Sequence, residues 1–87
     1  MLFRSLAAEI LAGTIDAVTF TSSSTVRGFV ELVGEPVAAS GRFAAAVIGP
    51  VTAGTARELG ITVAIEARDF TVPGLVDAIV RHYAGAG

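Results

Sequence analysis

The sequence predicts an α/β protein with a parallel sheet of about three strands, flanking helices and a helix as its first element. Three observations lead to this prediction. Apolar residues recur at helical spacing in four segments, short apolar runs typical of strands separate these segments, and the turns after the first two runs are rich in Ser, Thr, Gly and Pro. The chain is therefore expected to follow the order αβαβαβα.

The first helix is expected over Leu2–Ala12, because Leu2, Leu6 and Ile10 are four residues apart and Gly13 can cap its end. A strand is expected next, over Asp16–Phe20. The second helix is expected over Ser23–Val33, where apolar residues lie at i, i+3, i+4 and i+7, namely Val26, Phe29, Val30 and Val33.

Gly34 is expected to end the second helix, with Glu35 and Pro36 as its breaker, and residues 37–42 are expected to form a helical turn or a loop. The second strand is expected over Ala44–Ile48. A third helix is then expected from Pro50 to Leu59, with Gly60 as its stop.

The third strand differs in pattern from the first two. Ile61, Val63 and Ile65 alternate with more polar or smaller residues, which is typical of an edge strand, whereas the nearly continuous apolar runs of the first two strands predict burial on both faces. A last helix is expected from near Thr71, with its apolar residues at Leu75, Val76, Ile79, Val80 and Tyr83.

Composition excludes several classes of function. The 87 residues predict one domain, and a net charge of −2 with six dispersed Arg and no Lys argues against binding to nucleic acid or to an anionic membrane. The absence of Cys excludes disulfides and thiol chemistry, and fits a cytoplasmic location. No uncharged apolar run reaches the roughly 18–20 residues that a membrane-spanning helix needs.

The predicted sheet is incomplete. A doubly wound, flavodoxin-like domain normally begins with a strand and has about five strands, so the chain is expected to be a single partial domain over residues 1–87. The strand at Asp16–Phe20 would then have an open edge, and open edges recruit partners. We therefore expect a homodimer or higher oligomer, formed through this sheet edge or through the first helix.

Two turns that connect a strand to a helix contain residues suited to binding anions. The first strand is followed by a run of hydroxyl residues that includes Ser22–Thr25, and the second strand ends in Gly49-Pro50-Val51-Thr52. Such turns present free N–H groups at the positive end of a helix, which favours bound anions. Ser and Thr are also ordinary helix caps, so capping is the alternative role of Ser22–Thr25 and of Thr52.

Three motifs resemble uroporphyrinogen-III synthase, in its C-terminal region. They are I-D-A-V-T-F-T-S-S-S-T-V from Ile15, V-I-G-P-V-T-A-G-T-A-R-E-L-G from Val47 and F-T-V-P-G-L-V-D-A-I-V from Phe70, and they occur in the family's order and spacing. The resemblance implies a two-domain enzyme of tetrapyrrole biosynthesis. That enzyme closes linear hydroxymethylbilane into uroporphyrinogen III with inversion of ring D and loss of water, and it needs no metal or cofactor.

The resemblance also implies a substrate-binding surface. The family's substrate carries eight carboxylates and lies in a cleft between two domains, held largely by backbone amides and hydroxyl groups. Carried over residue by residue, the substrate-binding residues are Ser22, Ser23, Ser24, Thr25, Gly49, Val51 and Thr52, with Thr71 as a weaker candidate. No catalytic residue is carried over, because the tyrosine that assists loss of the hydroxyl group in the family has no counterpart here, and Tyr83 does not occupy its place.

Two other classes of function stay open on sequence alone. A flavodoxin-like module would bind phosphate at the same Ser/Thr-rich turn, although aromatic residues to enclose a flavin are not evident. A self-associating structural or interaction protein would need no ligand. His82, the single histidine, is expected near the end of the last helix, where a partial positive charge is favourable, and is not expected to be catalytic.

Overall fold

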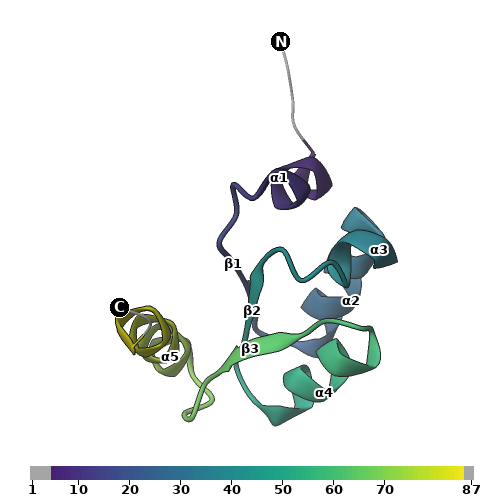
Figure 1. Cartoon of the computed structure of the whole chain (residues 1–87). Helices are drawn as coiled ribbons and strands as arrows, with labels where there is room; N and C mark the ends of the chain where they lie inside the picture. Colours follow the sequence, from purple (N-terminus) through teal and green to yellow (C-terminus); the bar gives the residue numbers. More distant parts are fainter. Residues whose placement is uncertain (1–4, 86–87) are drawn as a thin grey trace.

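The computed structural model of the chain describes residues 5–85 (Figure 1). Its elements are, in chain order, α1 (Leu6–Ala12), β1 (Ala17–Phe20), α2 (Ser23–Val33), α3 (Glu35–Ala38), β2 (Ala44–Val47), α4 (Pro50–Glu58), β3 (Val63–Glu66) and α5 (Val72–Gly85). The strands form one sheet in the order β1-β2-β3, with both neighbouring pairs parallel. This confirms an α/β fold with an open three-stranded parallel sheet and a helix first.

The register of the sheet brings the ends of β1 and β2 to one level. Ala17 lies opposite Ala44, and Phe20 lies opposite Val47. Beyond the last pair, the N–H of Ile48 donates to the carbonyl of Phe20 at 3.1 Å. The helices that follow these two strands therefore begin beside each other at the carboxyl edge of the sheet.

The larger core lies between one face of the sheet and helices α1, α2, α3 and α4. Phe20 of β1 and Val47 of β2 are almost fully buried there, against Ile10 and Val26. Edge-to-face contacts connect Phe29 to Phe20, with ring centroids 5.2 Å apart, and to Phe43 at 5.3 Å. Such geometry is favourable for aromatic pairs and fixes α2 on the sheet.

The second face of the sheet has a smaller core, formed by Ala46, Ile65, Ala67 and Leu75. Figure 1 shows α5 alone on this side, opposite α2, α3 and α4. Because α5 packs on β2 and β3, Thr19 of β1 is exposed. The expectation that the first strand is buried on both faces is therefore wrong, whereas burial of β2 and the edge position of β3 are confirmed.

Local chemistry explains where the first helices begin and end. Ser5 caps α1 by accepting the N–H of Ala8 at 3.1 Å, so the helix begins at Leu6, and the expected Leu2 lies outside the described residues. The bounds of α2 are those expected, since Ser22 caps its start and Gly34, at φ 88°, ends it. Glu35 and Pro36 end α2 but also begin the short helix α3, because proline suits the first turn of a helix.

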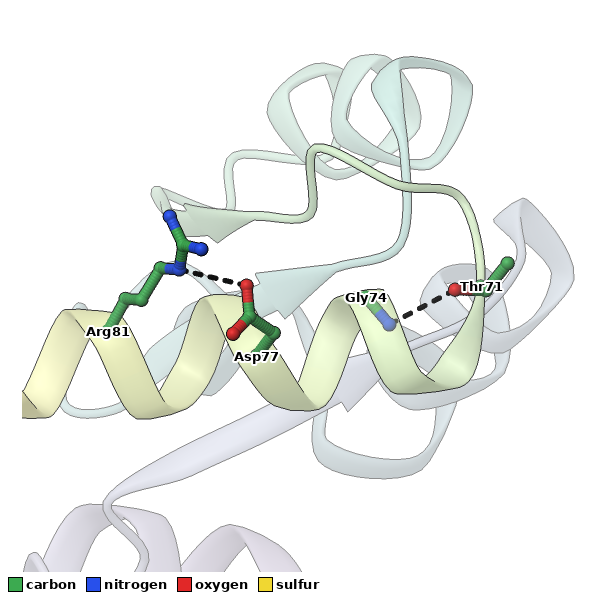
Figure 2. A network of polar contacts seen from close by, with 4 residues as sticks. All are labelled: Thr71, Gly74, Asp77 and Arg81. Atoms are coloured by element: carbon green, nitrogen blue, oxygen red, sulfur yellow. Dashed lines mark hydrogen bonds and ion pairs between the residues drawn. The ribbon is translucent and has the colours of Figure 1, made fainter.

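The start of α5 is fixed by a tight turn (Figure 2). The Thr71 hydroxyl accepts the N–H of Gly74 at 3.0 Å, and one turn further on the Arg81 Nε lies 2.9 Å from an oxygen of Asp77. Of the apolar residues expected in this helix, Leu75 is buried, whereas Val76, Val80 and Tyr83 are exposed. No helix within residues 5–85 is both long enough and apolar enough to cross a membrane.

Candidate functional site

The candidate site lies at the carboxyl edge of β1 and β2, where α2 and α4 begin. In open α/β sheets this edge is where ligands bind. The start of α2 contacts the second turn of α4, because the hydroxyl oxygens of Ser23 and Thr55 are 2.8 Å apart. The structure therefore brings together the two turns that the sequence singled out.

The α2 turn, Ser22–Thr25, has four hydroxyl groups. Two of them cap the start of α2. The Ser22 Oγ accepts the N–H of Thr25 at 3.2 Å, and the Thr25 Oγ1 accepts the N–H of Ser22 at 3.1 Å and donates to the Ser22 carbonyl at 2.6 Å. This is a capping box, so the structural role holds for both residues. Their hydroxyl groups are already satisfied without a ligand.

The other two hydroxyl groups of the α2 turn differ from each other. Ser23 is half-buried and faces Thr55, whose own hydroxyl also donates to the Val51 carbonyl at 3.3 Å. Ser24 is exposed and makes no hydrogen bond with its side chain to any residue that the structure describes. Of the four predicted residues, Ser24 therefore has the hydroxyl group most accessible to a ligand.

The α4 turn has no side-chain cap. Gly49 is its N-cap residue and offers no hydroxyl, and Pro50 has no N–H, so the N–H groups of Val51 and Thr52 begin the helix without a side-chain acceptor. The first backbone bond that closes the turn is from Ala53 to the Gly49 carbonyl, at 3.0 Å. Unpaired N–H groups at a helix start attract anions.

Thr52 is a buried residue with an unpaired hydroxyl group. The residue is 5% exposed, and its hydroxyl makes no hydrogen bond within residues 5–85. No fully buried side-chain oxygen of the described residues lacks a partner, so the Thr52 oxygen must retain contact with solvent. The hydroxyl therefore keeps some contact with solvent in the first turn of α4, where the N–H groups have no side-chain cap.

Thr55 and Phe70 were missed by sequence reasoning. Thr55 is 8% exposed and links the second turn of α4 to the start of α2. The ring of Phe70 packs on Gly49, since a Cβ built on this glycine would lie 3.2 Å from the ring's Cδ1. Phe70 opens the third motif of the sequence, which was the one available signal. The hydroxyl of Thr71, a predicted site residue, accepts the N–H of Gly74 at the start of α5.

A separate hollow of about 230 Å³ lies between β3 and α5. Both acidic and basic side chains line it, and its residues include Glu66, Arg68, Asp69, Asp77, Arg81 and His82. It does not include any residue of the α2 and α4 turns. No group of three or more His, Cys, Asp or Glu side chains within residues 5–85 is arranged to hold a metal ion.

Fold and site together define an α/β protein in which two helix starts meet at the carboxyl edge of a parallel sheet, one capped by hydroxyl groups and the other uncapped. Residues 3–77 match the family model described as uroporphyrinogen-III synthase HemD. The chain therefore belongs to the uroporphyrinogen-III synthase family, as its motifs indicated. Comparison with curated proteins and with solved structures gives no match.

Proposed function

We propose that this chain is a C-terminal part of a uroporphyrinogen-III synthase, a single partial α/β domain over residues 1–87, and that it binds the carboxylates of hydroxymethylbilane. The observation that carries the proposal is the start of α4, where the N–H groups and the hydroxyl of Thr52 have no hydrogen-bond partner among residues 5–85. Family membership supports the choice of a tetrapyrrole as the ligand. The ligand-binding groups are then the Ser24 hydroxyl, the N–H groups of Val51 and Thr52, and the Thr52 hydroxyl.

Neutral donors suit the reaction of this family. Ring D must turn over after the hydroxyl group leaves, so a substrate held by fixed charges would be hindered in that motion. N–H groups at a helix start attract carboxylates through a partial charge of about +0.5, which is weaker than a full ion pair. They hold the carboxylates while the rest of the linear tetrapyrrole can rearrange.

We expect the isolated chain to bind but not to cyclise hydroxymethylbilane. The family's cleft has two walls and a tyrosine that assists loss of the hydroxyl group, whereas Tyr83 lies in α5, three turns beyond its start. The assay is to supply hydroxymethylbilane and separate the product isomers. A yield of the type III isomer above that of the uncatalysed reaction would contradict the expectation.

Binding is tested by NMR titration of the chain with uroporphyrin, a polycarboxylated tetrapyrrole. The expected shifts are in the amide signals of Ser22–Thr25 and Gly49–Thr52, because the carboxylates accept hydrogen bonds there. Arg81 and His82 provide an internal control, since they lie in α5 and line the separate hollow. Shifts confined to these two residues would contradict the assignment of the site.

Self-association and location complete the proposal. Among residues 5–85 no strand pairs with the outer edge of β1, and Leu11 of α1 is 47% exposed. The open strand edge and the exposed leucine support a homodimer or higher oligomer, formed through the sheet edge or through the first helix. The absence of Cys supports a cytoplasmic location, because disulfides are rare in that compartment.

A further inference from the structure

We propose that Phe70 determines specificity at this site, by providing an apolar wall against which a pyrrole ring of the ligand packs. The inference rests on the proposed function, because it concerns the apolar part of the same ligand. Phe70 adds selectivity between different carboxylates, which the N–H groups and hydroxyl groups cannot supply. Those donors recognise any carboxylate, whereas an aromatic wall distinguishes a carboxylate attached to a flat ring from a small aliphatic one.

The first step of the argument is the position of the ring. Carbon atoms of the Phe70 ring lie 3.2 to 3.6 Å from the place that a Cβ of Gly49 would occupy. Gly49 is the N-cap residue of α4, so the ring lies at the start of the helix that has no side-chain cap. Phe70 therefore adjoins the N–H groups that are proposed to bind carboxylate.

The second step is the exposure of the ring. Phe70 is 65% exposed although phenylalanine is among the side chains most often buried. Val51, in the first turn of α4, is 78% exposed. Two apolar side chains thus flank the helix start, with much of their surface in water. A ligand that brings both carboxylates and apolar rings would bury this surface and satisfy the N–H groups together.

The third step is the rigidity of the loop that presents Phe70. On one side of it, the Ala67 N–H donates to the Val47 carbonyl at 2.9 Å, which anchors the loop to β2. On the other side, the Thr71 N–H donates to the Asp69 carbonyl at 2.8 Å and the Thr71 hydroxyl accepts the N–H of Gly74. Because the backbone is held at both ends, the ring is presented at a defined place beside Gly49.

The experiment compares two ligands on the whole 87-residue chain. Uroporphyrin has carboxylates around a flat ring system, and 1,2,3,4-butanetetracarboxylate has carboxylates on an aliphatic chain. The variants are Phe70→Ala, Phe70→Tyr and, as a matched control, Tyr83→Ala. Tyr83 is another exposed aromatic residue, and it is 11 residues beyond the start of α5, which corresponds to roughly 16 Å along the helix.

We expect Phe70→Ala to weaken uroporphyrin binding about three- to tenfold, the size of one aromatic packing contact, and to leave butanetetracarboxylate binding unchanged. Phe70→Tyr should retain the affinity for uroporphyrin, and Tyr83→Ala should have no effect. In the unchanged protein, ring-current shifts of the Phe70 proton signals on adding uroporphyrin provide a direct readout of contact. Circular dichroism checks that each variant is folded.

The results separate the two proposals. Equal affinity of the unchanged protein and Phe70→Ala for uroporphyrin, with no shift of the Phe70 signals, would overturn the role of Phe70 and leave the proposed function intact. Equal weakening for both ligands would overturn the specificity role as well, because Phe70 would then support the whole site. If the unchanged protein does not bind uroporphyrin at all, both proposals are overturned.

Discussion

The hydroxyl oxygens of Ser23 and Thr55 lie 2.8 Å apart, although the two residues are 32 positions apart in the chain. Ser23 is the first residue of α2, and Thr55 lies in the second turn of α4. The hydrogen bond between them joins the start of α2 to the second turn of α4. It therefore helps to set the distance between the groups that are proposed to bind two carboxylates of one ligand.

Thr55→Val removes this bond at almost constant volume. We expect a loss of about 1 kcal/mol in the free energy of unfolding, because the half-buried Ser23 hydroxyl loses its partner. Urea denaturation measures the change, and Thr55→Ser is the conservative control. In a double-mutant cycle with Ser23→Ala, a coupling energy near zero would show that the two hydroxyl groups do not stabilise each other.

Thr52→Val, in the same helix, removes a hydroxyl group whose expected role is to bind ligand and not to stabilise the fold. Thr52 and Thr55 are both buried residues, three positions apart, but the Thr52 hydroxyl has no partner within residues 5–85. We expect the stability of Thr52→Val to stay within about 0.5 kcal/mol of the unchanged protein, because no hydrogen bond is lost. Its affinity for uroporphyrin should fall about three- to tenfold, because a ligand then loses one hydroxyl donor.

The pair of variants separates structural from ligand-binding roles. Urea denaturation and uroporphyrin titration are applied to both. A Thr52→Val protein that loses as much stability as Thr55→Val, and binds as well as the unchanged protein, would remove Thr52 from the site.

The sequence was sufficient for features that depend on local chemistry. The bounds of α2 follow from a Ser cap, a helical apolar pattern and a terminal glycine, all within a dozen residues. The edge position of β3 follows from its alternation. The level ends of β1 and β2 brought the two predicted turns together, as expected for neighbouring parallel strands.

Features that depend on tertiary contacts were missed or mistaken. Nothing local to Phe70 indicates that its ring packs on Gly49, and nothing local to Thr55 indicates that it faces Ser23. The continuous apolar pattern of β1 suggested two covered faces, but α5 lies over β2 and β3 and leaves Thr19 exposed. Ligand contact by Thr71 stays a prediction, and in the structure its hydroxyl accepts the N–H of the nearby Gly74.

Gly74→Ala tests the turn that precedes α5. A Cβ at this position would lie 2.3 Å from the Asp69 carbonyl oxygen, which is backbone and cannot move aside without disturbing the turn. We expect a loss of about 1–3 kcal/mol in stability, in the range of overpacking substitutions. Gly28→Ala in α2 is the matched control, since a Cβ there meets nothing within 4 Å.

The control should shift stability in the opposite direction. Alanine within a helix is favoured over glycine by about 0.5–1 kcal/mol. Thermal and urea denaturation of both variants measure the difference. Equal stabilisation by the two substitutions would mean that the turn between Asp69 and Gly74 is not closed as described.

The last prediction concerns self-association through β1. The carbonyls of Asp16 and Phe20 accept N–H groups of the β2 side, from Ala44 and Ile48. Since backbone groups alternate in direction along a strand, the N–H and carbonyl of Thr19 point to the open edge. We expect the chain to form a dimer or higher oligomer at micromolar concentration, and Thr19→Pro to make it a monomer without breaking the bonds between β1 and β2, because proline removes only an outward N–H.

Light scattering measures the mass of each species, and Leu11→Glu distinguishes the two possible interfaces. Leu11 is an exposed apolar residue of α1, so a charge there would separate subunits that associate through the first helix and would leave edge pairing intact. A monomer in Leu11→Glu, with an oligomer retained in Thr19→Pro, would assign the interface to α1. If the unchanged chain is a stable monomer at micromolar concentration, the open edge of β1 does not recruit a second copy, and the expected oligomer is wrong.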